Sequence, residues 1–188
     1  MEPEAIEAAI RRLLAETTAM TLATSGVAGP DGVLPWASTV YFAPNGYDLV
    51  FLSSPTSRHG SNLAANPACA AAVSPETASW RDIRGLQLEG RAATVTGLAA
   101  KARAMAAYCA KFPFVEALLA DPGEAARRLG RVSAHVLRPT SIRYLDNTLG
   151  FGARWLVRLE EGRPRGPPHR ENPDRGSTAP VGQPQCTP

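Results

Sequence analysis

The apolar positions near the start of the chain repeat with the period of an α-helix. Residues 4–16 place five apolar side chains on one face, with charged side chains opposite: Ile6, Ala9, Ile10, Leu13 and Leu14. Spacings of three and four residues are typical of an amphipathic helix that packs its apolar stripe on a core. We therefore expect a helix here that packs on the rest of the fold and has no chemical role.

After this helix, short apolar or alternating runs replace the helical period. They predict six strands, at residues 18–25, 33–42, 47–53, 68–74, 86–96 and 132–137. Asn45-Gly46 lies between the second and third strands, and both residue types tolerate the positive φ of a tight hairpin turn. Three strands with no long helix between them favour an antiparallel meander or barrel over a βαβ layout. Pro139 is expected to make an edge or a bend of the residues after the sixth strand.

Helical spacing returns at three places. A short helix is predicted between Ser57 and Asn66-Pro67, a longer one over 98–112, and a further helical segment over 114–130 with a break at Asp121-Pro122-Gly123. From residue 159 the composition changes, because proline, glycine and arginine dominate and apolar residues almost vanish. Such a segment buries too little apolar surface to offset its ordering entropy. The sequence thus predicts one domain over 1–158 and a disordered tail over 159–188.

Composition narrows the class of protein. A chain of 188 residues suits one domain, and a hydrophobic content of 44% is ordinary for a globular protein. The net charge is only +3 and no long Lys/Arg run occurs, so no nucleic-acid partner is indicated. No apolar run approaches the roughly 18–20 residues that span a bilayer, and no signal peptide is seen. Three cysteines without metal-ligand spacing fit a reducing compartment, so we expect a cytoplasmic protein that does not bind a membrane.

Residues 51–67 hold the strongest candidate for chemistry. An apolar strand end meets Pro55, which has no backbone donor, and Ser57 then has the position of a helix N-cap. Free N–H groups at a helix start, beside Arg58 and His59, make the kind of site that holds a phosphate. The alternative is a capped surface helix with an incidental Arg-His pair.

Three other side chains have a structural interpretation beside a functional one. Trp36 shares a face of the second strand with Phe42, and both side chains are expected to fill the core. Gln87 lies between two core leucines and points off the core, where an isolated amide is most simply solvent-exposed. His135 is a lone histidine in an apolar alternation, which favours a hydrogen-bonded structural residue over a metal ligand.

Three separate motifs carry a resemblance to a known family. They are the Ser57-Arg58-His59 helix start with Asn66-Pro67, the segment Gly85–Arg91, and the closing segment Asp146–Gly152. In this order they resemble the FMN-binding split barrels of the pyridoxamine 5′-phosphate oxidase-like superfamily, over roughly residues 5–157. The closing segment resembles that of an uncharacterised bacterial branch. The resemblance implies a mainly β fold with α: an antiparallel split β-barrel of six or so strands in Greek-key order, with flanking helices.

The resemblance also implies a cofactor and a site. FMN would bind at a homodimer interface, with its phosphate at the helix start and its ring along the second strand, where small side chains let a planar ligand approach the backbone. The implied cofactor-binding residues are Trp36, Ala37, Ser38, Thr39, Ser53, Thr56, Ser57, Arg58, His59, Asn62 and Gln87. Asn147 and Thr148 of the closing segment either reach a ligand or only shape a turn. The implied function is a flavin-dependent oxidoreductase acting on a small molecule.

The residues also depart from the family pattern. Many FMN-binding relatives have Lys where this chain has His59, and an unperturbed His is mostly neutral at pH 7. FMN binding is therefore expected to tighten between pH 8 and pH 6 if His59 contacts the phosphate. The residues that grip the vitamin phosphate in true pyridoxamine phosphate oxidases have no evident counterpart near this C-terminus, so that activity is not expected.

Two other classes of function remain open. One is a non-catalytic cofactor-binding protein that holds haem, with His59 and His135 as the axial-ligand candidates of the ordered part, or a deazaflavin in the same groove. The other is a dimeric scaffold without cofactor. No Ser-His-Asp or paired-carboxylate arrangement is apparent that would carry catalysis unaided.

Overall fold

The fold is a mainly β structure flanked by α-helices. The computed structural model describes residues 1–29, 32–123, 127 and 130–171. The helices are α1 (Pro3–Glu16), α2 (Arg58–Ala65), α3 (Leu98–Lys111) and α4 (Pro113–Leu119), with single 3₁₀ turns η1 (Trp80–Asp82) and η2 (Asn147–Leu149). The strands are β1 (Ala19–Ser25), β2 (Pro35–Asn45), β3 (Asp48–Ser53), β4 (Ala68–Val73), β5 (Arg84–Thr94), β6 (Ser133–Asp146), β7 (Arg154–Glu160), β8 (Arg163–Pro164) and β9 (His169–Glu171).

Six of these strands form a closed antiparallel barrel. Neighbours pair in the order β3-β2-β1-β4-β5-β6, and β6 returns to pair with β3. Since β4 lies beside β1 and not beside β3, the chain crosses the barrel between β3 and β4, through α2. The predicted split barrel with flanking helices is confirmed, and its six predicted strands are these six.

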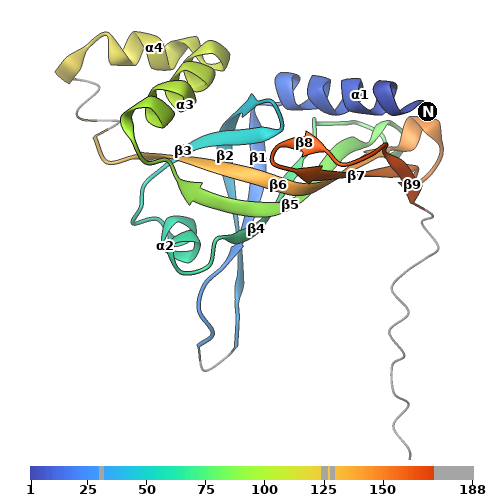
Figure 1. Ribbon diagram of the computed structural model, residues 1–188, viewed down its shortest axis with the longest axis horizontal. Coiled ribbons are helices and arrows are strands. Elements are labelled where there is room, and N and C mark those ends of the chain that lie inside the picture. Colours follow the sequence, from blue (N-terminus) through green and yellow to red (C-terminus); the bar gives the residue numbers. More distant parts are fainter. Residues whose placement is uncertain (30–31, 124–126, 128–129, 172–188) are drawn as a thin grey trace, which may run out of the picture.

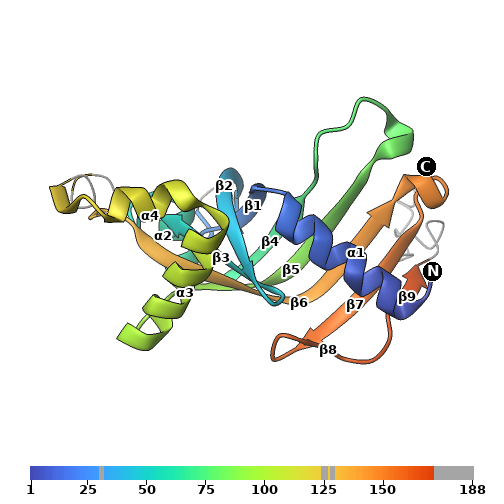
Figure 2. The ribbon, with the colours of Figure 1, turned by 90° about the horizontal axis from the view of Figure 1, so that it is seen from above.

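The helices lie on two sides of the barrel (Figures 1 and 2). α1, α3 and α4 lie on the upper side in Figure 1, whereas α2 lies on the lower side beside the projecting β1–β2 hairpin. α1 buries the predicted stripe of apolar residues in the barrel core. Lys111 connects α3 to the end of α1, because its Nζ donates to the carbonyl oxygens of Leu14 at 2.8 Å and Thr17 at 2.6 Å. Among the described helices, none combines the length and the apolar character needed to cross a membrane.

The sixth strand is longer than predicted. β6 runs through Pro139, and the residues after it pair with both β5 and β7, so the expectation of an edge there is wrong. The register between β5 and β6 shifts at Glu89/Gly90, directly opposite the proline, so the missing proline donor falls in an irregular part of the ladder. A Cβ on Gly90 would lie 2.3 Å from the carbonyl oxygen of Arg138, so only glycine fits this close approach of the two strands.

The predicted tail begins too early. β7 ends at Glu160, and β8 and β9 both pair with it, so residues 159–171 form part of the sheet. Proline-rich composition hid these strands because each has only two or three residues and no apolar alternation. Residues 172–188 lie outside the described residues, and the tail predicted for them stays a prediction. The predicted helix over 114–130 is present as α4, and its continuation past Asp121 lies partly outside the described residues.

Candidate functional site

The start of α2 is built as the sequence predicts. Ser57 is the N-cap, and its Oγ accepts a hydrogen bond from the backbone N–H of Gly60 at 3.1 Å. The same hydroxyl donates to the carbonyl oxygen of Ser54 at 2.7 Å. A Cβ on Gly60 would lie 2.6 Å from that carbonyl oxygen, so glycine is required for this tight turn. With the Gly60 N–H used by the cap, the N–H groups of Arg58 and His59 are the first-turn donors without an intrahelical acceptor.

Arg58 presents a cation at this helix start. Its guanidinium carbon lies 4.2 Å from the centroid of the Trp36 ring, and it has no ion pair within the described part of the chain. Trp36 is 38% exposed, so the expectation that it fills the core is wrong, whereas Phe42 on the same strand face is fully buried as expected. Trp36 lies at the exposed start of β2, and Arg58 covers its ring. The surface formed by Trp36 and Ser38 beside the start of α2 is called the barrel opening.

His59 is held by hydroxyl groups on both sides of its ring. Nε2 lies 2.5 Å from Ser53 Oγ, and Nδ1 lies 3.1 Å from Ser38 Oγ. Burial lowers the pKa of His59, so the ring is neutral at neutral pH. The structure therefore brings Ser38, Ser53 and His59 together, but it does not present His59 as a second cation beside Arg58.

His135 lies in the core behind this group. It is 3% exposed and stacks on Phe51 with ring centroids 5.1 Å apart. Its Nδ1 is 3.4 Å from Thr94 Oγ1, and its Nε2 has no hydrogen-bond partner among the described residues. Burial lowers the pKa of His135, and the nearby charge of His59 lowers it further. The structural role predicted for this histidine is consistent with its packing.

Asn62 and Thr56 lie on the two sides of the helix start. Asn62 donates to Thr24 Oγ1 at 3.1 Å and, with Arg58 and Leu34, lines a cavity of about 230 Å³ beside the β1–β2 hairpin. Thr56 Oγ1 lies 2.9 Å from Ser54 Oγ in the exposed turn. The cofactor contact expected of both side chains stays a prediction.

The other predicted residues lie on the outer face of the barrel. Ala37 and Thr39 alternate with Ser38 and are exposed, so they face away from His59. Gln87 is exposed on β5, where its register partners are Ala72 and Arg143. The structure does not bring Gln87 to the start of α2 within one chain, and its contact with a ring stays a prediction.

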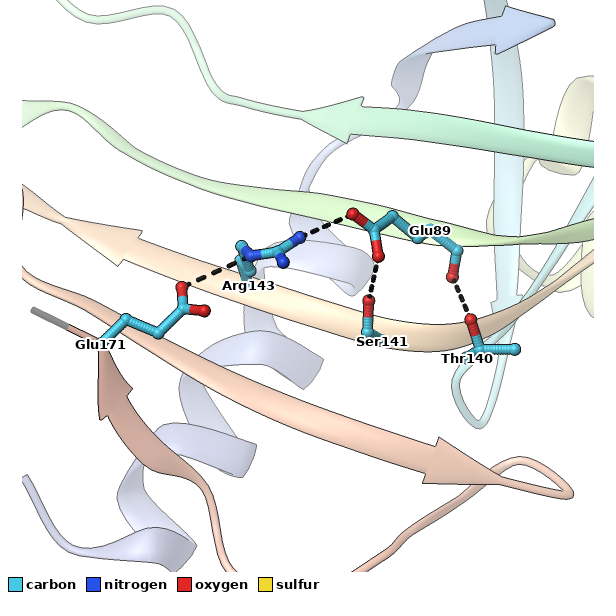
Figure 3. Close-up of polar contacts among 5 residues, drawn as sticks. All are labelled: Glu89, Thr140, Ser141, Arg143 and Glu171. Carbon is cyan, nitrogen blue, oxygen red and sulfur yellow. Dashed lines mark hydrogen bonds and ion pairs between the residues drawn. The ribbon is translucent and has the colours of Figure 1, made fainter. Parts of the chain in front are cut away.

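Beside Gln87, side chains from three strands form a network of hydrogen bonds and ion pairs (Figure 3). Arg143 of β6 donates to Glu89 of β5 at 2.8 Å and lies 3.4 Å from Glu171 of β9, and Ser141 donates to Glu89 at 3.0 Å. Hydrogen bonds from Arg143 and Ser141 lower the pKa of Glu89. These contacts fix the outer face on which Gln87 lies and attach the last strand to it.

The closing segment Asp146–Gly152 uses its own side chains to shape a turn. Asp146 caps η2 by accepting from the Thr148 N–H at 3.0 Å and from its hydroxyl at 2.6 Å. Asn147 donates to the Trp80 carbonyl oxygen at 2.7 Å and accepts from the Gly152 N–H at 3.0 Å. The structural interpretation of Asn147 and Thr148 is therefore the one that the contacts favour.

Sequence reasoning missed the pairing of Ser38 with His59. The two residues come from β2 and α2, and no sequence spacing relates them. The alternation along β2 was the one available signal. Ser38 falls on the same strand face as Trp36 and Phe42, and Phe42 is buried, so this face of β2 is the one directed inward.

Comparisons with known proteins agree with this architecture. The sequence profile of the family named Pyridoxamine 5′-phosphate oxidase matches residues 6–146. A UPF0306 protein of Photorhabdus laumondii is 27% identical over 147 residues, which are 77% of this chain and 90% of that protein.

Two solved structures share the fold. A heme binding protein from Mycobacterium smegmatis superposes with a TM-score of 0.63 and 27% identity, and the match covers 84% of this chain and 59% of that one. Campylobacter jejuni ChuZ superposes with a TM-score of 0.64 at 16% identity, covering 86% of this chain and 61% of that one. This chain therefore spans less than two thirds of either protein.

Proposed function

The chain belongs to the pyridoxamine 5′-phosphate oxidase family, and from that premise we propose that it binds FMN at the start of α2 and acts as a flavin-dependent oxidoreductase on a small molecule. The observation that carries the proposal is Arg58. It is a cation without an ion pair in the described residues, and it lies over Trp36 at a helix start with open N–H groups. A guanidinium and first-turn N–H groups are the donors that bind a phosphate.

The residues at this helix start fit a phosphate, with one exception. Arg58 would supply the charge, and Thr56 and Ser57 would supply hydroxyl and backbone contacts around it. His59 does not fit the phosphate role that the resemblance implies, because Ser38 and Ser53 occupy both of its ring nitrogens. The cavity beside Arg58 and Asn62 gives the rest of a ligand room next to the helix start.

FMN supplies hydride transfer when bound, and the protein supplies binding, orientation and electrostatics. Trp36 and Ser38 face the barrel opening and would flank the planar part of the ligand. Gln87 lies on the outer face, so it would reach the same ligand only from a second copy of the chain, which agrees with the proposed homodimer.

The first test is an absorption spectrum of the protein purified without added cofactor, followed by FMN and riboflavin titrations monitored by fluorescence quenching. Riboflavin lacks the phosphate, so Arg58→Ala should weaken FMN binding by about 10- to 100-fold and leave riboflavin binding almost unchanged. Arg81→Ala is the matched control, because Arg81 also lies over a tryptophan, Trp80, at 5.2 Å but far along the chain from α2. A colourless protein without saturable quenching would contradict the proposal and leave a dimeric scaffold or a deazaflavin as the ligand to test.

Haem binding is the second candidate function. It is supported by the 27% identity to the heme binding protein of Mycobacterium smegmatis and by His135 Nε2, for which the described residues supply no side-chain hydrogen-bond partner. Against it, His135 is almost fully buried and both ring nitrogens of His59 are in use. The same spectrum separates the candidates, because haem gives a strong Soret band and FMN does not. A haem titration with His135→Phe would then show whether this ring is the ligand.

A further inference from the structure

A continuous set of hydrogen-bond contacts runs from the cap of α2 to the opening of the barrel. The Gly60 N–H donates to Ser57 Oγ, and the Ser57 hydroxyl donates to the Ser54 carbonyl oxygen. Ser53 Oγ lies 3.3 Å from Ser57 Oγ and 2.5 Å from His59 Nε2. His59 Nδ1 lies 3.1 Å from Ser38 Oγ, which ends the set at the half-buried Ser38.

The positions of the protons follow from donor counting. Each hydroxyl has one proton, and that of Ser57 is used on the Ser54 carbonyl oxygen. The Ser53–Ser57 contact is therefore a hydrogen bond only if Ser53 donates to Ser57. His59 Nε2 must then carry the hydrogen and donate to Ser53, which leaves Nδ1 as an acceptor. The Ser38 hydroxyl is the donor that faces this acceptor, and this arrangement satisfies every contact at once.

We propose that Ser38 and His59 form a nucleophile and general-base pair, oriented by Ser53, that gives this opening an ester-hydrolysing activity. A nucleophile within hydrogen-bond reach of a base, with the base held by a third group, is the arrangement that activates serine. The contacts of 3.1 Å and 2.5 Å on the two sides of the His59 ring meet this requirement. Ser38 also borders the proposed FMN site, but the hydrolytic activity does not rest on FMN binding.

The surroundings of Ser38 indicate the class of substrate. Leu34 and Trp36 share its strand face and are exposed, so an apolar acyl group has a surface on which to lie. The Arg58 guanidinium lies over Trp36, two residues before Ser38 on the same strand face, so it places a positive charge on the side of β2 where the oxyanion would develop. Burial lowers the pKa of His59, which keeps its ring neutral and able to accept a proton at neutral pH. These features fit small esters with an apolar acyl group.

The proposed hydrolysis consumes only the ester and water. Ser38 Oγ would form a bond to the ester carbonyl carbon while its proton passes to His59 Nδ1. The ester C–O bond would then break, and the leaving alcohol would take that proton. Water would cleave the acyl-serine by the same route, with His59 first accepting and then returning the proton, which regenerates Ser38.

The test is labelling of the full chain by an alkyl fluorophosphonate, with the modified peptide identified by mass spectrometry. The Ser38 Oγ–P bond forms as the P–F bond breaks, fluoride leaves, and the serine proton passes through His59 to solvent. Label is expected on Ser38, absent in Ser38→Ala, and slower by about 100-fold or more in His59→Gln, because general-base catalysis contributes roughly that factor. Ser133→Ala is the matched control, since Ser133 lies opposite Ser53 in the β3–β6 pair, and its labelling rate should equal that of the unaltered chain.

Two measurements on the unaltered chain test the proposed Ser38–His59 pair even if a variant fails to fold. The ¹⁵N spectrum of His59 should show a protonated Nε2 and an unprotonated Nδ1, and the labelling rate should fall with a single ionisation below pH 6.5. The opposite tautomer, label on other serines, or a rate that His59→Gln leaves unchanged would overturn the proposal. FMN titration of the same sample is independent, so a failure of the pair and a failure of flavin binding are distinguishable.

Discussion

Arg58 lies over the indole of Trp36, with its guanidinium carbon 4.2 Å from the ring centroid. The contact comes from two elements, because Trp36 lies near the start of β2 and Arg58 is the first residue of α2. The ring restricts a long side chain that would otherwise sample many rotamers, so the guanidinium is held at the helix start before any anion arrives. This preorganisation gives the first prediction.

Replacing Trp36 by leucine should weaken FMN binding through Arg58. A partly exposed cation–π contact contributes about 0.5–1 kcal/mol, which corresponds to about a 2- to 5-fold increase in Kd. The measurement is the FMN titration of Trp36→Leu beside Trp80→Leu, which removes a second arginine–tryptophan contact. An unchanged Kd in Trp36→Leu, or an equal change in both variants, would show that the stacking does not position Arg58.

The affinity for FMN should be flat between pH 8 and pH 6.5. The sequence alone suggested that binding tightens between pH 8 and pH 6, as a His59 cation forms beside the phosphate. Burial lowers the pKa of His59 below its ordinary value of 6.5, and serines occupy both ring nitrogens, so the ring stays mostly neutral in that range. Titrations at pH 8, 7.2 and 6.5 check this. A steady tightening across these values would place His59 in contact with the phosphate.

How far the sequence determined the fold is clearest at Pro139. The alternation of apolar residues located all six barrel strands, because burial of one strand face imposes a period of two. The continuation of β6 through Pro139 could not be predicted from local rules, since it depends on Gly90 of a different strand allowing a close approach. Rules for single segments contain no information on such a pair.

The candidate site likewise has some features that consecutive residues encode and others that depend on contacts between distant segments. The cap at Ser57 and the cation at Arg58 were predictable because a helix start is encoded by consecutive residues. The roles of Ser38 and His59 were not, because they depend on where β2 and α2 meet in space. Gln87 shows the remaining limit, since it is exposed on the outer face of β5 and the contact proposed for it would involve a second copy of the chain.

The stability of the protein should fall as the pH drops below 6.5, in part because of His135. Burial and the charge of His59 lower the folded-state pKa of His135 below its unfolded value, so the unfolded chain binds more protons in that range. Stability contributed by the neutral ring is present above pH 6.5 and is lost below it, with a limiting slope of about 1.4 kcal/mol per pH unit for one group.

Urea unfolding at pH 7.5 and pH 5.5 measures this loss. His135→Phe keeps a ring against Phe51 and should reduce the difference between the two pH values. His169→Phe is the control, because His169 is exposed on β9 and should leave the difference as it is. Equal pH dependence in the unaltered chain and in His135→Phe would show that His135 does not contribute to the acid sensitivity.

Gly90→Ala should destabilise the barrel strongly, because the new methyl group would lie 2.3 Å from the Arg138 carbonyl oxygen. The contact is with backbone, so no side-chain rotation relieves it, and β5 must separate from β6 at the register shift opposite Pro139. We expect a loss of roughly 3 kcal/mol or more in the free energy of unfolding, measured by urea titration. Gly29→Ala is the matched control, since a Cβ there has no neighbour within 4 Å. If both alanine variants unfold at the same urea concentration, the strands tolerate a side chain at Gly90, and another feature must allow β6 to continue through its proline.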